Sequence, residues 1–254
     1  MTLHLVQLVP DSGALVRFAH RAGLPEDDPG YLWHRALRDA FGPLAPQPFR
    51  SLDPGGQPVS LLGYGPADDD RLREALTLAA PDLERVFPPD RIRSKELPLP
   101  FTAGRRLAFE TRVCPIVRTL SSDGSRQREL DAFAHHALGM AHEPRPEREL
   151  VYRVWLANRL DAAGCRLAAA RMASFRLGPL VRRRHASPAA RTPTEDGPAR
   201  RLLATSRRGA ARRPEVVFEG VLEVTEPGTF ASSLARGIGR HRAFGFGMLL
   251  LRPA

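Results

Sequence analysis

The sequence predicts an α+β protein built from two tandem βαββαβ units. Stretches in which apolar and polar residues alternate, as in strands, recur in the same order relative to helix-like stretches in both halves of the 254-residue chain. The helix-like stretches have apolar residues on one face, as expected of helices that cover one side of a sheet. A βαββαβ unit folds as a ferredoxin-like domain, so we expect two such domains, at residues 1–104 and 105–254.

The first unit opens with a strand of alternating, β-prone residues and continues through a hairpin. A Pro-Gly-Gly turn predicts that hairpin, and Pro81 interrupts the last helical stretch because proline has no N–H to donate. The predicted elements are a strand at 2–9, helices at 14–21 and 31–42, strands at 48–54 and 58–65, a helical stretch at 68–87 and a strand at 92–100.

The second unit repeats this order with longer connections. Pro115 lies inside its first strand and predicts an edge position or a bulge there. A mobile basic loop is expected at 186–213, which is poor in apolar residues and rich in Pro, Ser and Arg. The predicted elements are a strand at 105–120, a polar turn at 121–131, a mixed stretch at 130–140, a helix at 149–164, a stretch at 165–185 that is extended or partly helical, a strand at 214–227, a helix from a Thr229 N-cap to Gly237 and a strand at 246–253. The helix at 149–164 has its predicted buried stripe at Val151, Val154, Trp155 and Leu160.

The helix at 31–42 carries the first candidate site. Apolar residues at helical spacing predict its buried stripe: Trp33, Ala36, Leu37, Ala40 and Phe41. Tyr31 and Arg38 lie on the side away from that stripe, and His34 lies at its edge. A histidine at such a boundary often has no function. Here, however, the tyrosine three residues before it and the arginine four residues after it share its side of the helix, which favours a site.

The stretch at 236–253 holds four glycines around a basic cluster and is the second candidate site. Glycine adopts positive φ, which lets successive backbone N–H groups converge on an anion, and arginines add the charge that a phosphate attracts. The alternative is a glycine-capped helix end followed by a bulged strand. The predicted anion-binding residues are Arg236, Gly237, Gly239, Arg240, His241, Arg242, Gly245 and Gly247.

The net charge of +10 is concentrated in the second unit. Residues 1–104 contain 11 Lys and Arg against 14 Asp and Glu, a net charge of −3, whereas residues 105–254 contain 27 against 14, a net charge of +13. This asymmetry indicates a polyanionic partner. The arginines within the second unit either follow the phosphates of an RNA stem or form a solvated surface. They include Arg182, Arg183, Arg184 and those at 200–213.

Several other classes of protein are not expected. No apolar run reaches the ~18–20 residues that span a membrane, and the N-terminus has neither the charged region nor the cleavage site of a secretory signal. Cys114 and Cys165 are isolated in apolar stretches, which fits a reducing cytoplasm. No P-loop, dinucleotide fingerprint or nucleophile elbow occurs, and His135, His136 and His142 match no metal-binding spacing. We therefore expect a cytoplasmic protein without a metal or cofactor.

The final stretch resembles one known family. Residues 237–253, GIGRHRAFGFGMLLLRP, resemble the glycine-rich loop of the CRISPR precursor-RNA processing endoribonucleases, most of all the CasE subunits of type I-E Cascade complexes. RVCPIVR at 112–118 and VFEGVLEV at 217–224 are similar to two strands of that family. The insertion at 186–213 and the cysteine before Pro115 depart from its pattern.

The first candidate helix agrees with this resemblance. Its H-x-x-L-x-x-x-F pattern, formed by His34, Leu37 and Phe41 with Tyr31 three residues earlier, is similar to the catalytic helix of the family. The resemblance implies an endoribonuclease that binds the CRISPR repeat hairpin of precursor and mature crRNA and remains with other Cascade subunits. It implies a metal-independent cut at the 3′ base of the stem-loop.

Metal-free RNA cleavage requires a base, an acid and positive charge on the crowded phosphate. His34 is the candidate for proton transfer because imidazole titrates near neutrality, and Tyr31 has a supporting role. Arg38, Arg240 and Arg242 are candidates for stabilising the phosphate, and the expected ends are a 5′-hydroxyl and a 2′,3′-cyclic phosphate. The alternatives are a non-catalytic subunit that holds the crRNA hairpin and a basic scaffold protein without hairpin preference.

Overall fold

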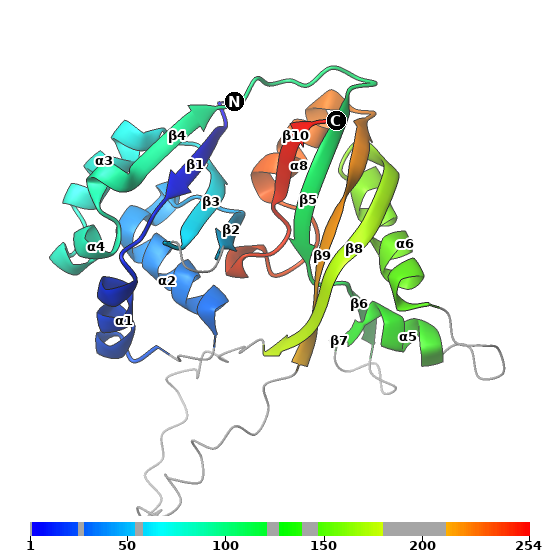
Figure 1. Cartoon of the computed structure of the whole chain (residues 1–254), viewed down its shortest axis with the longest axis horizontal. Helices are drawn as coiled ribbons and strands as arrows, with labels where there is room; N and C mark the ends of the chain where they lie inside the picture. Colours follow the sequence, from blue (N-terminus) through cyan, green and yellow to red (C-terminus); the bar gives the residue numbers. More distant parts are fainter. Residues whose placement is uncertain (1, 25–27, 54–57, 121–126, 139–146, 180–211) are drawn as a thin grey trace, which may run out of the picture.

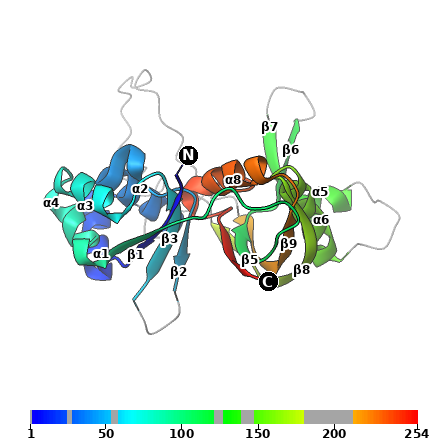
Figure 2. The same ribbon diagram turned by 90° about the horizontal axis from the view of Figure 1, so that it is seen from above.

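Two four-stranded antiparallel sheets form the frame of the protein. The computed structural model describes residues 2–24, 28–53, 58–120, 127–138, 147–179 and 212–254. The two sheets lie next to each other, and the helices of the first unit cover the outer side of its sheet (Figures 1 and 2). This arrangement confirms the predicted α+β class with two ferredoxin-like βαββαβ units.

The first sheet has the strand order β2-β3-β1-β4. Alternation along β1 turns Val6 and Leu8 toward the helices, where they join the first apolar core. Pro81 starts a separate helix, as the interruption predicted. The elements of this unit are β1 (His4–Leu8), α1 (Ser12–Arg21), α2 (Pro29–Phe41), η1 (Gly42–Leu44), β2 (Phe49–Leu52), β3 (Ser60–Gly65), α3 (Asp69–Thr77), α4 (Pro81–Val86), η2 (Pro89–Arg91) and β4 (Ile92–Glu96).

The second sheet repeats this arrangement with the order β10-β5-β9-β8. Phe109 of β5 and Phe218 of β9 share the second apolar core with Trp155 of α6 and Phe230 of α8. The elements of this unit are β5 (Arg106–Val113), β6 (Ile116–Leu120), β7 (Gln127–Asp131), α5 (Ala132–Leu138), α6 (Arg148–Asp161), β8 (Cys165–Pro179), β9 (Arg212–Val224), α8 (Pro227–Arg236), η3 (Arg242–Phe244) and β10 (Leu249–Pro253).

The chain leaves the second sheet at Cys114 and Pro115, so the predicted strand at 105–120 is two strands. β5 is central and pairs with both β10 and β9, and proline lacks the N–H that a central strand must donate. Beyond the proline, β6 pairs with β7 as a separate hairpin. The predicted polar turn at 121–131 is therefore wrong for its last five residues, which form β7.

The predicted buried stripe of α6 is confirmed at Trp155 and Leu160 but not at Val151 and Val154. The buried residues of α6 are Tyr152, Trp155, Leu156 and Leu160. Val154, predicted to be buried, is 54% exposed. Tyr152 takes a buried position because its hydroxyl lies 2.8 Å from Asp131 Oδ1 and accepts a hydrogen bond from Arg148 at 2.8 Å. Polar partners elsewhere in the chain therefore let a tyrosine replace a valine in the core.

Two further boundaries differ from the sequence prediction. α8 begins at Pro227 with Glu226 as its N-cap residue, and Thr229 lies inside the helix, where its hydroxyl donates to Glu226 at 2.9 Å. Of the predicted stretch at 165–185, residues 165–179 form one long strand, β8, which decides for extended structure there, and residues 180–185 lie outside the described residues. The predicted mobile loop at 186–213 lies outside the described residues except for its last two, which begin β9.

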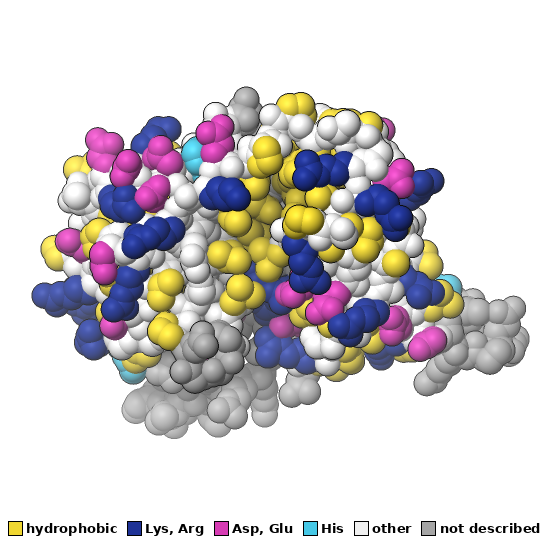
Figure 3. Space-filling model, turned by 45° about the horizontal axis from the view of Figure 1, so that its top comes forward, with side chains coloured by type: hydrophobic (Ala, Val, Ile, Leu, Met, Phe, Trp, Pro, Cys, Tyr) yellow, Lys and Arg dark blue, Asp and Glu magenta, His cyan; other side chains and the backbone are white. Residues whose placement is uncertain are grey.

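The helix-free faces of the two sheets meet along a seam. Tyr64 of β3 is buried there and donates its hydroxyl to the carbonyl of Leu249 in β10 at 2.7 Å. Arg50 of β2 pairs with Glu110 of β5 at 2.5 Å. Figure 3 shows hydrophobic side chains gathered between the two halves, with arginines beside them. These contacts fix the first unit against the second.

Two smaller predictions concern the thiols and the membrane. Cys114 and Cys165 are free and buried, and burial raises the pKa of both thiols to about 12. Both thiols are therefore protonated at neutral pH. Within the described ranges of the chain, no helix combines the length and the apolar character needed to cross a membrane.

Candidate active site

The first turn of α2 is fixed by the residues that start it. Asp28 Oδ1 accepts a hydrogen bond from the backbone N–H of Tyr31 at 2.9 Å, and Pro29 occupies the first helical position. The predicted stripe is confirmed, because the buried residues of α2 are Trp33, Ala36, Leu37, Ala40 and Phe41. The packing of this stripe leaves Tyr31, His34 and Arg38 outside the first core.

The glycine-rich loop after α8 contacts the start of α2 through Phe244. The Phe244 ring lies edge-on to His34, with ring centres 5.5 Å apart, and stacks on Tyr31 at 6.3 Å. A Cβ added to Gly30 would lie 2.6 Å from the carbonyl oxygen of Phe244, so only glycine allows this approach. The loop therefore forms a wall beside the two predicted catalytic side chains.

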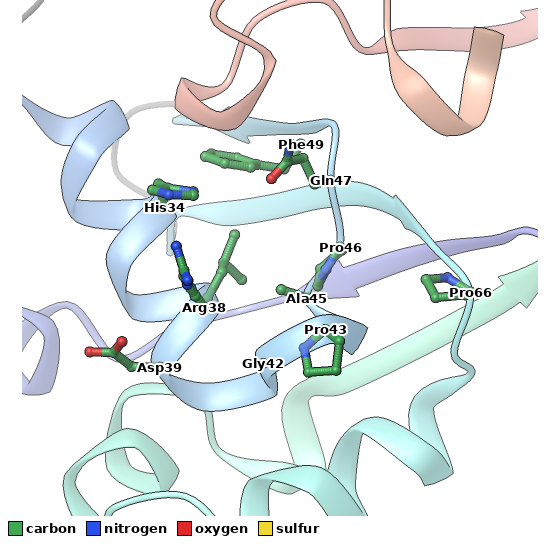
Figure 4. A pocket seen from close by; sticks show the side chains of 11 residues that line it. His34, Arg38, Asp39, Gly42, Pro43, Ala45, Pro46, Gln47, Phe49 and Pro66 are labelled. Atoms are coloured by element: carbon green, nitrogen blue, oxygen red, sulfur yellow. The ribbon is translucent and has the colours of Figure 1, made fainter. Parts of the chain in front are cut away.

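His34 and Arg38 line an open pocket of about 740 Å³ (Figure 4). The Arg38 guanidinium points toward the His34 ring, and Gln47 extends toward the same space from the opposite wall (Figure 4). Arg38 is exposed and makes no ion pair within the described part of the chain, whereas its neighbour Asp39 pairs with Arg35 at 2.7 Å. The pocket thus offers an imidazole and an unengaged guanidinium to one ligand.

The surroundings of His34 disfavour its protonated form. Burial lowers the pKa of its imidazole, the positive charges of Arg38 and Arg35 lower it further, and Asp39 opposes them. The ring is therefore predominantly neutral at pH 7. A neutral imidazole can accept a proton, as a general base must.

All four glycines predicted to have positive φ do so. Their φ angles lie between 69° and 82° at Gly237, Gly239, Gly245 and Gly247. Gly247 is the most constrained, because an added Cβ would overlap the carbonyl oxygen of Ile238. Its N–H donates to the carbonyl of Arg112 in β5 at 2.7 Å. Gly237 also caps α8, so the alternative reading of a glycine-capped helix end describes part of the same loop.

Two of the predicted anion-binding side chains face a carboxylate of the protein itself. Arg240 Nε lies 3.0 Å from Glu129 Oε1, and His241 Nε2 lies 3.6 Å from Glu129 Oε2. Arg213 of β9 joins them, 3.6 Å from Glu129 Oε2, and donates to the Glu129 carbonyl at 2.8 Å. The Glu129 side chain is only 5% exposed. This Glu129 cluster ties the glycine-rich loop to the β6–β7 hairpin.

Sequence reasoning missed the Glu129 cluster. Glu129 belongs to a strand that the sequence analysis assigned to a turn, and its partners lie more than 80 residues further along the chain. Charged residues this far apart carry no local signal of their pairing.

The other arginines predicted to bind RNA either hydrogen bond to the backbone of the loop or are exposed. Arg242 Nη1 donates to the carbonyls of Arg236 at 2.9 Å and Gly237 at 3.4 Å, at the helix end that favours cations. Arg236 and Arg38 are exposed. The arginines at 182–184 lie outside the described residues.

The described histidines of the second unit form no metal site. His135 and His136 are exposed on α5, and residue 142 lies outside the described residues. Across the described ranges, no three His, Cys, Asp or Glu side chains gather closely enough to hold a metal ion.

Comparisons with known proteins give one family-model match and several matches to solved structures. The family model for CRISPR associated protein matches residues 5–253, and no curated protein matches the chain by sequence. A CRISPR endoribonuclease Cse3 bound to a 19-nucleotide RNA is similar in structure, with a TM-score of 0.63 and 20% identity over the whole of both chains.

Two further solved structures share the fold. Thermus thermophilus Cse3, bound to an RNA representing a pre-cleavage complex, has a TM-score of 0.59 and 20% identity over the whole of both chains. The CRISPR-associated protein Cas6e of Escherichia coli K-12 has a TM-score of 0.56 and 15% identity, covering 99% of this chain and 100% of that one. At these identities, the likeness establishes the fold.

Proposed function

The chain belongs to the CRISPR-associated protein family, and from that membership we propose that it is an endoribonuclease of precursor CRISPR RNA. It cuts at the 3′ base of the repeat stem-loop and retains the mature crRNA as a Cascade subunit. The observation that carries this proposal is the pocket shared by His34 and Arg38, flanked by Phe244 of the glycine-rich loop. The fold shared with endoribonucleases solved in complex with RNA supports it.

In the proposed reaction, His34 acts as the base. Its neutral ring takes the proton of the 2′-hydroxyl, and the 2′-oxygen attacks the adjacent phosphorus. The bond from phosphorus to the 5′-oxygen breaks, and that oxygen keeps the electron pair and takes up a proton from water. The products are a 2′,3′-cyclic phosphate and a 5′-hydroxyl, and no metal takes part.

Tyr31 and the arginines support this step. Tyr31 lies one helical turn before His34 against the same Phe244 ring, where its hydroxyl can position the ribose. Arg38 stabilises the negative charge that grows on the phosphate, because it lines the pocket and has no carboxylate partner within the described residues. We assign direct RNA contacts to Arg38 and Arg236, and we assign Arg240, His241 and Arg242 to shaping the loop that holds the RNA.

The proposal predicts one discrete cut in the repeat RNA of the protein's own CRISPR locus in the presence of EDTA. The RNA is end-labelled, incubated with the chelator-treated protein and separated on a denaturing gel, and acid treatment or phosphatase distinguishes a cyclic phosphate end. Tight binding without a cut would support the non-catalytic alternative. Cleavage that appears only after a divalent metal is added would overturn the metal-independent mechanism.

The pH dependence of cleavage follows from the lowered pKa of His34. The base form exists above this pKa, so kcat/KM should fall as pH drops through it, with the midpoint of the acidic limb below the ordinary histidine value of about 6.5. The measurement is a series of single-turnover rates at sub-saturating protein between pH 4.5 and 8.5. A limb centred above 6.5, or a rate that falls only toward high pH, would contradict the role of His34 as base.

A further inference from the structure

Gln47 lies on the pocket wall opposite α2, in a segment whose backbone is held on both sides. Its N–H donates to the carbonyl of Tyr64 at 2.8 Å, and the Tyr64 N–H donates to the carbonyl of Pro48 at 3.0 Å. Pro46 precedes it, so prolines restrict the backbone on both flanks. Tyr64 is itself buried and bonded to β10, so this anchor is firm.

The side chain of Gln47 is presented to a ligand. It is exposed, and its amide makes no hydrogen bond within the part of the chain that the structure describes. In Figure 4 the amide extends from the wall toward the side of the pocket where His34 lies. A rigid backbone that carries an unengaged amide is suited to recognition, because little ordering of the protein is needed on binding.

The pocket is larger than a phosphate alone requires. Its volume is about 740 Å³, and the exposed rings of Pro43 and Pro66 line it together with the polar groups, whereas Pro46 and Phe49 are buried behind its wall. Flat apolar walls favour the faces of a nucleobase, as aromatic side chains do in single-stranded RNA recognition. Arg38 supplies the charge for a phosphate, whereas the neutral Gln47 amide adds none.

We infer that Gln47 is a specificity residue that hydrogen bonds to the edge of the nucleobase next to the scissile phosphate. A primary amide offers both a donor and an acceptor, which matches the paired donor and acceptor groups of a base edge. The base lies in the proline-lined part of the pocket, while its phosphate lies between His34 and Arg38. This inference rests on the proposed function, because it concerns the RNA bound at the same pocket.

The test is a binding cycle that does not depend on cleavage. Wild-type protein and the Gln47→Leu variant are titrated with a hairpin RNA made uncleavable by a single 2′-deoxy substitution at the cut. The same RNA is also prepared with an abasic nucleotide on the 5′ or the 3′ side of the scissile phosphate. Gln7→Leu is the control, because Gln7 is an exposed glutamine of β1 in the same unit and does not line the pocket. Thermal unfolding of each variant checks that the fold is intact.

We expect Gln47→Leu to weaken binding of the intact RNA about tenfold, the scale of one good side-chain contact with a base edge. Wild-type protein should bind one of the two abasic RNAs more weakly than the intact RNA, by the same factor. The Gln47→Leu substitution should weaken binding of that abasic RNA no further. Gln7→Leu should bind every RNA as the wild type does. The inference is overturned if Gln47→Leu binds intact RNA normally, or if it weakens both abasic RNAs as strongly as the intact one. If wild-type protein does not cleave the hairpin that keeps its 2′-hydroxyl, the proposed enzymatic activity is refuted. The binding measurements with the uncleavable RNAs still decide whether Gln47 contacts the base.

Discussion

Replacing His34 by alanine should lower the single-turnover rate of hairpin cleavage by about 10²–10⁴-fold, the usual contribution of a general acid or base. Binding of the hairpin should change little, because the neutral imidazole contributes proton transfer and not charge to the complex. The rate is measured with protein in excess over labelled RNA. The affinity is measured separately with the 2′-deoxy RNA, so the two effects do not mix.

The control for this substitution is His135→Ala. His135 is an exposed histidine on α5 in the second unit, and its loss should leave both rate and affinity unchanged. Normal cutting by His34→Ala would show that the base lies elsewhere. A parallel fall in affinity and rate would show that His34 acts through binding of the RNA.

Replacing Glu129 by glutamine should lower the free energy of unfolding by about 2 kcal/mol. The change keeps the size of the side chain but removes the negative charge that lies 3.0–3.6 Å from Arg213, Arg240 and His241. A fully buried pair that loses one partner is destabilised by ~3–5 kcal/mol. The effect here is smaller because Arg240 is 32% exposed and water can solvate it in part. Urea unfolding followed by tryptophan fluorescence measures the difference.

Glu223→Gln is the matched control for the Glu129 cluster. Glu223 pairs with Arg166 on the neighbouring strand at 3.1 Å, but the Arg166 side chain is 66% exposed. Removing such a surface pair costs about 0–1 kcal/mol. Equal losses of unfolding free energy in the two variants would mean that the Glu129 cluster is no more than a surface ion pair.

Local patterns carried enough information to predict most of the fold. The stripe of α2 and the alternation along β9 follow from the residues within each element, because a helix or a half-buried strand has a fixed period. The same periodicity predicted which side of α2 faces away from the core, and with it His34 and Tyr31. The order of strands and helices was sufficient for the ferredoxin-like class.

Predictions failed where a residue's environment is set by a distant part of the chain. Tyr152 is buried because Asp131 lies against its hydroxyl, and no pattern within α6 reveals that partner. β7 has the composition of a turn, and it becomes a strand because β6 supplies its hydrogen bonds. No local pattern reveals that Arg240 lies 3.0 Å from the buried carboxylate of Glu129, and its predicted role in RNA binding stays a prediction. Gln47 was not singled out because a glutamine between two prolines has no distinctive motif.

The contact between Phe244 and Gly30 also determines when the proposed activity can begin. The ribosome adds residues from the N-terminus, and early domains fold while later ones are still being made. α2 therefore emerges long before Phe244, and a nascent chain has its first unit in place without the wall that flanks His34 and Tyr31. Translation must therefore pass residue 244 before the Phe244 ring lies against His34 and Tyr31. Under the proposed function, the RNA-binding surface is then complete only after the second unit has been made.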